Sequence, residues 1–206
     1  MNICILGATG RVGSLILSKA LNDGHEVQAL VRNSGIIPFQ HPKLKWVIGN
    51  ALDKEHINEV LRDVELVISA LNTDGNSTLS RSIPIIIDTM KISGISRIVT
   101  IGTAGILQSR LQPELYRFQS TESRNRSTKA AEDHLLAYHQ LKESDLDWTI
   151  VCPTYLPDGN QTGSYRTEKD FLPNKGLSIS TADTAEFAYN QLFSTKFLKC
   201  RVGISY

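Results

Sequence analysis

The sequence predicts a single α/β domain built on a Rossmann-type, doubly wound parallel sheet. Three observations support this prediction: short apolar runs alternate with amphipathic segments, the first run ends at a glycine-rich turn, and the 206 residues suit one domain. An apolar run without polar alternation, such as residues 2–6, is typical of a strand buried on both faces. A chain of this length buries roughly 70% of its unfolded surface, which allows a sizeable core.

Strands and helices are expected in alternation along residues 1–206. The apolar runs predict strands at residues 2–6, 26–31, 45–48, 64–71, 97–101 and 148–151, and an edge strand at 197–204. Helices are expected at about 11–22, 53–62, 84–93, 128–143 and 183–193. Asp53 and Asp183 are suitable N-caps, and Pro84 suits an early helical position. The polar segments 105–127 and 158–176 lack periodicity, which predicts two long loops after the fifth and sixth strands.

Composition narrows the class of partner. The formal net charge of +1 gives no electrostatic basis for binding nucleic acid or an anionic membrane. The three cysteines form no CxxC pair, as is typical of free thiols in a reducing compartment. We see no run suited to a secretion signal or membrane span, and no metal-binding spacing among the five histidines. We therefore expect a cytoplasmic protein, monomeric or homodimeric, with a small-molecule partner and no metal.

A glycine-rich turn joins the first strand to the first helix, with the sequence Gly7-Ala8-Thr9-Gly10-Arg11-Val12-Gly13. The first glycine permits a tight turn, the second lets the backbone approach a pyrophosphate, and the third lets helix and strand pack closely. Amides at the helix N-terminus then face the phosphates, whose charge the helix dipole favours. Because the turn closes the first strand of an alternating pattern, it indicates a dinucleotide site in residues 1–104. A merely structural turn is the alternative.

The end of the second strand bears on the choice of cofactor. An NAD site needs an Asp or Glu there for the ribose 2′-hydroxyl, whereas an arginine suits the 2′-phosphate of NADP. The sequence at this point is Val31-Arg32-Asn33-Ser34, without an acid. Arg32 offers a planar guanidinium, its neighbours offer further donors, and Arg11 is within reach of the same phosphate. We expect NADP rather than NAD; a solvated surface arginine is the alternative for Arg32.

Several segments resemble one protein family. The glycine turn resembles the GxxGxxG turn of atypical and extended short-chain dehydrogenase/reductases, and the strand end at Arg32 resembles theirs. Residues 49–53, GNALD, are similar to the segment that borders the adenine, with Asn50 in place of the usual first acid. Residues 145–153, DLDWTIVCP, resemble the sixth strand of the NmrA-like and NAD(P)H-flavin reductase (biliverdin reductase B-like) branch. The resemblance runs from end to end and specifies the branch, but no substrate.

The resemblance implies a set of site residues. Thr103 occupies the place of the superfamily's catalytic serine, and Lys129 that of the lysine that bonds the nicotinamide ribose. A strand-end hydroxyl satisfied by backbone is the alternative for Thr103. Together with the turn, the resemblance assigns these further residues to the cofactor: Gly7, Thr9, Gly10, Arg11, Val12, Gly13, Arg32, Asn33, Asn50, Ala51, Leu52, Ser69, Ala70, Leu71, Pro153, Thr154, Tyr155 and Leu156.

The sequence departs from that family at two positions. Asn125 stands where the superfamily has its tyrosine, four residues before Lys129, and Cys152 replaces the arginine of the sixth strand. Tyr138 and Lys142 spell the superfamily's YxxxK, but Lys142 lies thirteen residues beyond Lys129. At ~1.5 Å per residue the helix carries it ~20 Å away from the carboxyl ends of the strands, where ligands bind. We therefore expect Tyr138 to pack against the sheet.

The missing tyrosine removes the general acid that a carbonyl reducer uses. Hydride transfer to a flavin or quinone needs two aligned planar rings, and the proton can come from solvent. The leading hypothesis is an NAD(P)H-dependent oxidoreductase that reduces a small planar acceptor, with FMN or FAD as substrate rather than prosthetic group. Thr103 and loops 105–127 and 153–176 are expected to shape the acceptor pocket. The alternative is an NADP(H)-binding redox sensor without turnover; an epimerase or dehydratase is disfavoured by the missing tyrosine.

Overall fold

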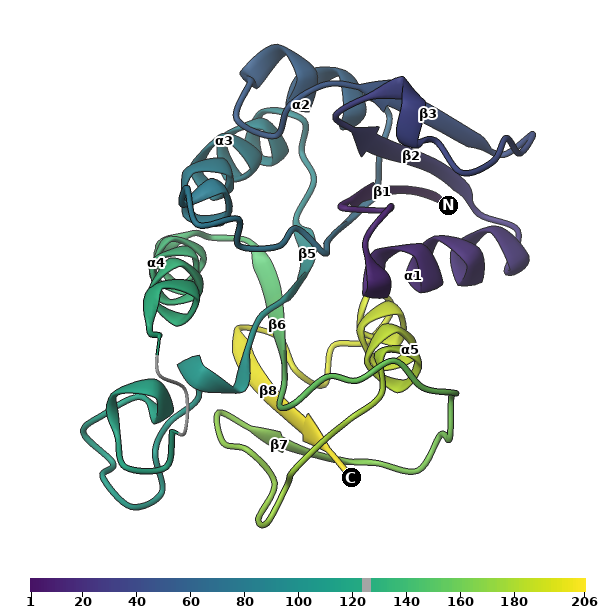
Figure 1. Ribbon diagram of the computed structural model, residues 1–206. Helices are drawn as coiled ribbons and strands as arrows, with labels where there is room; N and C mark the ends of the chain where they lie inside the picture. The colour runs from purple at the N-terminus through teal and green to yellow at the C-terminus, as the bar shows by residue number, and fades with distance from the viewer. Residues whose placement is uncertain (124–126) are drawn as a thin grey trace.

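An eight-stranded sheet runs through the part of the chain that the computed structural model describes, residues 1–123 and 127–206 (Figure 1). Its strand order is β3-β2-β1-β4-β5-β6-β8-β7, and all neighbours are parallel except the antiparallel pair β7–β8. This confirms the predicted doubly wound sheet and adds one antiparallel strand to it. The strands are β1 (Asn2–Leu6), β2 (Glu26–Val31), β3 (Leu44–Ile48), β4 (Leu66–Ser69), β5 (Arg97–Ile101), β6 (Asp147–Pro153), β7 (Arg166–Lys169) and β8 (Cys200–Ser205).

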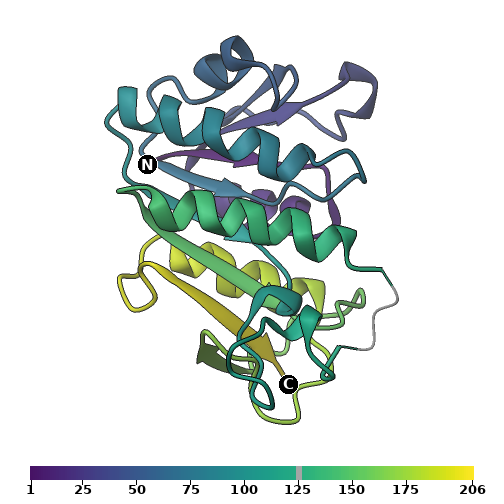
Figure 2. The same ribbon diagram turned by 90° about the vertical axis from the view of Figure 1, so that its left-hand side faces the viewer.

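Helices cover both faces of the sheet. In Figure 1, α1 (Arg11–Asn22) and α5 (Thr181–Gln191) lie on one side of the strands, and α2 (Lys54–Val60), α3 (Thr78–Ile92) and α4 (Lys129–Glu143) lie on the other. Figure 2 looks onto the second face, where α3 and α4 run side by side across the sheet. Among the described residues, no helix combines the length and hydropathy needed to cross a bilayer.

Strand β1 shows why both layers are needed. Successive side chains of a strand point to opposite faces, so Ile3 and Ile5 join the core beneath α1 and α5, whereas Cys4 and Leu6 join the core beneath α2, α3 and α4. All four are fully buried. A strand with one apolar face can leave its other face exposed to solvent. Strand β1 is apolar on both faces, so it requires a layer of helices on each side, as the sequence indicated.

The third helix begins earlier than predicted. It starts at Thr78, and Pro84 lies inside it rather than in its first turn. The backbone N–H of Ser80 near the N-terminus of α3 donates to the carboxylate of Asp133 on α4, at 2.9 Å. A side chain 53 residues away in the sequence therefore stabilises the first turn, which explains why local signals placed the boundary too late.

The C-terminal part differs from the prediction in two ways. The expected loop 158–176 contains strand β7, and β8 therefore lies between β6 and β7 instead of at the edge. The N-cap of α5 is Ser180, whose hydroxyl accepts from the N–H of Asp183 at 3.0 Å. Asp183 instead accepts from the N–H groups of Thr162 and Gly163. The predicted cap thus holds the preceding loop against the helix.

Other boundaries need smaller corrections. Strand β4 is shorter than the predicted 64–71, strand β6 is longer than 148–151, and β8 spans 200–205 rather than 197–204. The predicted Asp53 cap is confirmed, because its carboxylate accepts from the N–H groups of Glu55 and His56. The expected loop 105–127 carries two short 3-10 turns, η2 (Ala104–Ile106) and η3 (Arg117–Gln119).

Candidate functional site

The glycine turn between β1 and α1 depends on close backbone contacts. Gly7 has a positive φ of 81°, and a Cβ there would lie 2.5 Å from the carbonyl oxygen of Ala70. A Cβ on Gly13 would lie 2.1 Å from the carbonyl oxygen of Gly7. Gly10 is less confined, because its Cβ would meet only that same oxygen, at 3.3 Å. Gly7 and Gly13 are therefore required for packing, whereas the space beside Gly10 is open to a ligand.

The N-terminus of α1 presents free amide groups at this turn. Gly10 is the N-cap residue and provides no side-chain cap. The first intrahelical bond runs from the N–H of Ser14 to the carbonyl of Gly10, at 2.9 Å. The amides of Arg11, Val12 and Gly13 precede it and have no acceptor within the helix. Such a terminus carries partial positive charge and is suited to bind phosphate oxygens.

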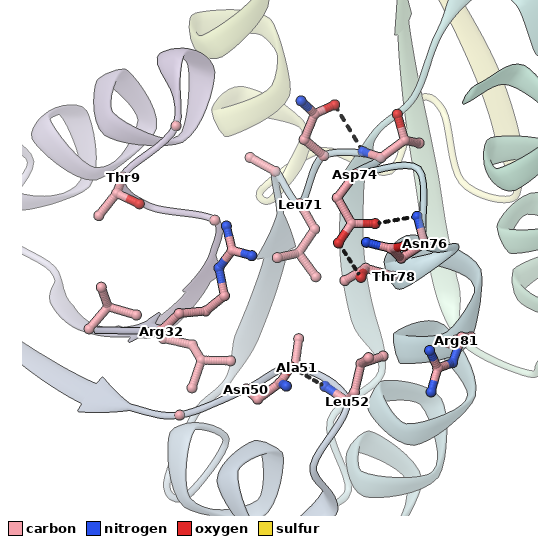
Figure 3. Close-up of a pocket in the computed structure, with 18 of the residues that line it drawn as sticks. Thr9, Arg32, Asn50, Ala51, Leu52, Leu71, Asp74, Asn76, Thr78 and Arg81 are labelled. Atoms are coloured by element: carbon pink, nitrogen blue, oxygen red, sulfur yellow. Dashed lines mark hydrogen bonds between the residues drawn. The ribbon is translucent and has the colours of Figure 1, made fainter. Parts of the chain in front are cut away.

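A cavity of about 570 Å³ lies at the carboxyl ends of β1, β2, β3 and β4 (Figure 3). We call it the cofactor cavity. Nine of the predicted cofactor residues line it: Gly7, Thr9, Gly10, Arg32, Asn50, Ala51, Leu52, Ala70 and Leu71. These residues follow four different strands, and the parallel sheet brings the strand ends together at one edge.

Only one of the residues predicted to bind a 2′-phosphate lines the cofactor cavity. Arg32 extends into it in Figure 3. The side chain of Asn33 instead accepts from the N–H of Gly35 at 2.8 Å, because it caps the turn that follows β2. Arg11 donates to the carbonyl of Leu156 and forms a 3.0 Å ion pair with Asp158, so its guanidinium is engaged by the loop after β6. The expectation for Arg11 overlooked this partner.

The loop after β4 and the first turn of α3 contribute cavity residues that sequence reasoning missed: Asn72, Thr73, Asp74, Asn76, Thr78 and Arg81. The carboxylate of Asp74 accepts from the Thr78 hydroxyl at 2.7 Å and from the Asn76 amide at 2.9 Å, and these bonds hold the pKa of Asp74 below its usual value. Asp74 faces Arg32 from across the cavity (Figure 3). The signal for this loop was the polar run DGNS directly after a strand that ends at the ligand-binding edge.

Three predicted cofactor residues lie in the adjoining structure without lining the cavity. Val12 is buried in the first turn of α1, beside the tightly packed Gly13. Ser69 ends β4 and is buried, and its hydroxyl has no hydrogen-bond partner among the described residues. They belong to the walls that hold the turn and the strand end in place.

A second cavity of about 600 Å³ lies at the carboxyl ends of β5 and β6, and we call it the acceptor cavity. The loop after β5 supplies one side, and the loop after β6 supplies the other. Four of the predicted site residues line it: Thr103, Pro153, Thr154 and Tyr155. The other lining residues are Ala104, Gly105, Arg117, Phe118, Glu122, Ser123, Gly176 and Leu177. Tyr155 and Leu177 are 71% and 78% exposed, so this cavity has an open, apolar lip.

Thr103 uses one side of its hydroxyl in the backbone. Its Oγ1 accepts from the N–H of Gly105 at 3.3 Å, at the start of η2. This bond agrees with the alternative of a backbone-satisfied hydroxyl, and it leaves the O–H available to donate into the cavity. Leu156 packs on the core and Lys129 is exposed at the start of α4; neither lines a cavity. Asn125 lies outside the described residues.

Two ionisable groups of the acceptor cavity have shifted pKa values. Burial lowers the pKa of the half-buried Arg117, and the nearby Glu122 partly opposes that shift. Partial burial raises the pKa of Glu122, but bonds from the Ser109 hydroxyl and the Arg110 amide outweigh it and leave the pKa lowered. Glu122 is therefore a carboxylate at neutral pH and cannot act as a general acid there.

The YxxxK pair does not lie at either cavity. Tyr138 is buried and packs edge-on against Trp148, with ring centroids 5.9 Å apart. The guanidinium of Arg201 lies 4.5 Å from the centre of its ring. In residues 1–123 and 127–206, no group of three or more His, Cys, Asp or Glu side chains is placed to hold a metal ion. The two cavities are therefore the candidate sites for chemistry at the strand ends.

Comparison with known proteins identifies the family. YwnB of Bacillus subtilis, an uncharacterized protein, is 27% identical over 203 residues, 93% of this chain and 92% of YwnB. A Bacteroides thetaiotaomicron structure, provisionally named an epimerase, is 31% identical with a TM-score of 0.87 and covers 100% of this chain and 96% of its own. A Streptococcus pneumoniae structure, provisionally named an NADH-flavin reductase, shares the fold at 23% identity and a TM-score of 0.84, over 100% and 99%. Residues 7–195 match the NAD(P)H-binding family model, so the protein belongs to the NAD(P)H-binding family and its cofactor is a nicotinamide dinucleotide.

Proposed function

We propose that the protein is an NAD(P)H-dependent oxidoreductase that transfers a hydride to a small planar acceptor such as a flavin or a quinone. The observation that carries this proposal is the order of the two cavities along one sheet edge. The cofactor cavity spans the ends of β3, β2, β1 and β4, and the acceptor cavity follows at β5 and β6. A dinucleotide with its pyrophosphate at the glycine turn extends its nicotinamide toward that second cavity.

The polar groups of the cofactor cavity favour NADPH over NADH. Arg32 lines the cavity at the end of β2, and residues 31–34 contain no acid to bind a free ribose 2′-hydroxyl. Arg32 forms no ion pair with any described residue, so its guanidinium can form charge-assisted bonds with a 2′-phosphate. Asp74 lies in the same cavity and is held by its own loop, which keeps its carboxylate away from this role.

The acceptor cavity is suited to a flat ring. Phe118 and Tyr155 offer aromatic faces, and Pro153 and Leu177 add apolar surface. The bound cofactor supplies the hydride, while this chain orients the two rings. The O–H of Thr103 can donate to the nicotinamide carboxamide or to an acceptor oxygen. Because Glu122 is ionised, we assign the proton to solvent, and FMN or FAD is then a substrate rather than a resident group.

A steady-state assay with NADPH and either FMN or a quinone tests the proposal. We expect NADPH to be consumed in proportion to enzyme, with a higher kcat/KM than with NADH. The proposal fails if calorimetry shows NADPH binding while neither acceptor accelerates NADPH oxidation above background.

That failure is the outcome expected for the second candidate function, a redox sensor that binds NADP(H) without turnover. The backbone bond to Thr103 favours this candidate, because it gives the hydroxyl a structural role. A sensor is expected to bind one oxidation state of the dinucleotide more tightly than the other. Parallel titrations with NADPH and NADP⁺ distinguish the two functions.

A further inference from the structure

One cation of the acceptor cavity forms no ion pair with the described residues. Arg117 lines the cavity from the turn η3 and is half-buried. No carboxylate of the described residues lies within ion-pair distance of its guanidinium, and no hydrogen bond joins that guanidinium to another described residue. The nearby Glu122 attracts this guanidinium but forms no ion pair with it, so an anion that enters the cavity can bond to it directly.

Other arginines of the chain are satisfied by the protein itself. The buried Arg201 pairs with Asp170 and donates to the carbonyl of Ile106. The buried Arg97 donates to three backbone carbonyls and to the hydroxyl of Thr149. Arg110, in the same loop as Arg117, pairs with Glu168. Arg117 differs from them, because it is half-buried and its guanidinium donates no hydrogen bond to another described residue.

The carboxylate of Glu122 already accepts hydrogen bonds from neighbouring groups of the protein. It lines the same cavity, but its Oε2 accepts from the Ser109 hydroxyl and from the N–H of Arg110, the latter at 2.8 Å. Both bonds end on Oε2, and Glu122 forms no ion pair with Arg117, so the guanidinium remains available to a ligand.

The turn that carries Arg117 is held in a defined place. The N–H of Arg117 donates to the carbonyl of Leu107 at 2.8 Å, and its carbonyl accepts from the Ser120 hydroxyl at 2.9 Å. The preceding Tyr116 stacks with Phe118 at 6.5 Å and lies 5.4 Å from the Arg201 guanidinium. The backbone that carries this cation is therefore fixed before a ligand arrives, which reduces the entropy lost on binding.

We infer that the acceptor cavity takes a planar molecule with a pendant phosphate or carboxylate, and that the guanidinium of Arg117 binds this oxyanion. The inference rests on the proposed function, because it assigns the substrate class of the same site. The ring then packs beside Phe118 and Tyr155 while the anionic group reaches η3, so Arg117 determines specificity and takes no part in hydride transfer. Among flavins, FMN fits this description and riboflavin does not.

Equilibrium binding to the protein saturated with NADP⁺ tests the inference without requiring turnover. Calorimetric titration should show FMN binding about tenfold more tightly than riboflavin, the factor that one hydrogen bond to a charged group provides. The variant Arg117→Gln should abolish that preference by weakening FMN alone, and Arg117→Lys should retain part of it. A second pair, 2-naphthoate against the neutral 2-naphthamide, reports whether a carboxylate serves as well as a phosphate.

Arg62→Gln is the matched control, because it removes the same charge from an arginine at the opposite end of the sheet. It should leave the preference for FMN intact. Equal affinity for FMN and riboflavin in the wild type, or equal weakening of both by Arg117→Gln, overturns the inference. Failure of the proposed function looks different: the FMN preference persists in binding, but NADPH is not oxidised.

Discussion

The two cavities occupy the same edge of one sheet, yet they are built in different ways. The cofactor cavity is lined by segments that directly follow β1, β2, β3 and β4, and its shape depends on backbone contacts such as that between Gly7 and Gly13. The acceptor cavity is lined by two long loops whose positions depend on side chains from elsewhere. Close backbone contacts therefore define the cofactor cavity, whereas side-chain contacts between distant segments define the acceptor cavity.

Arg201 illustrates the second kind of construction. It lies in β8, 5% exposed, and its guanidinium donates to the carbonyl of Ile106 in η2. The same side chain forms a 3.3 Å ion pair with Asp170 and contacts the rings of Tyr116 and Tyr138. One buried cation therefore connects the C-terminal strand to the loop that lines the acceptor cavity.

The largest effect is expected where backbone contact defines the cofactor region. Gly13→Ala places a methyl group 2.1 Å from the carbonyl oxygen of Gly7, so the strand and helix must separate. We expect the free energy of unfolding to fall by about 3 kcal/mol, the upper range for overpacked sites, in a urea titration.

Gly10→Ala is the control for that variant. Its methyl group meets one atom at 3.3 Å, so the fold should be retained. If Gly13→Ala unfolds at the same urea concentration as the wild type, the cofactor region is not defined by backbone packing.

A smaller effect, confined to the acceptor region, is expected for Arg201→Met. Loss of the guanidinium frees η2, so the acceptor KM should rise about tenfold, as expected when a charged hydrogen bond is lost. The dissociation constant of NADPH should not change, because the glycine turn does not depend on β8.

Arg97→Met provides a matched comparison, since Arg97 is also buried but lies at the opposite end of β5. It should lower stability and leave the acceptor KM unchanged. An equal rise of the acceptor KM in both variants indicates general loosening instead of a specific support.

A change of charge in the cofactor cavity tests the choice of dinucleotide. Arg32→Gln should weaken NADPH about tenfold, the contribution of one charge-assisted bond, and leave NADH unaffected. Calorimetric titration with both dinucleotides measures this. Equal weakening of NADPH and NADH contradicts the assignment of Arg32 to the 2′-phosphate.

The last prediction concerns the stability of the contact between α3 and α4. Burial lowers the pKa of His134 on α4 to about 4, with Asp133 partly opposing the shift. The unfolded chain has an ordinary histidine pKa of ~6.5 and binds a proton first, so stability should fall as the pH drops from 6.5 toward 4.

His134→Gln should remove this part of the pH dependence, which thermal unfolding at several pH values measures. An unchanged pH profile in the variant shows that His134 does not contribute.

The same contrast explains how much the sequence could predict. The glycine turn and the strand ends at Arg32, Asn50 and Leu71 follow from local patterns, so the sheet and nine of the residues that line the cofactor cavity were predicted. Local patterns also identified Asp53 as a cap, because its acceptors follow directly in the chain.

Contacts between distant segments account for what was missed. Arg11 pairs with Asp158, which lies 147 residues away, and no local pattern indicated this partner. Residues 166–169, RTEK, carry no apolar side chain and form a strand only because β8 pairs with them. Arg117 was missed for the same reason, since its position depends on the turn η3 and on the backbone bond to Leu107.

Calorimetric titration of NADPH into the wild type and into Gly10→Ala tests the central claim most directly. The account predicts saturable heat with the wild type and none with the folded variant, because the added methyl group takes the place of a phosphate oxygen at the N-terminus of α1. Heat of equal affinity from both proteins, or no heat from the wild type, contradicts it.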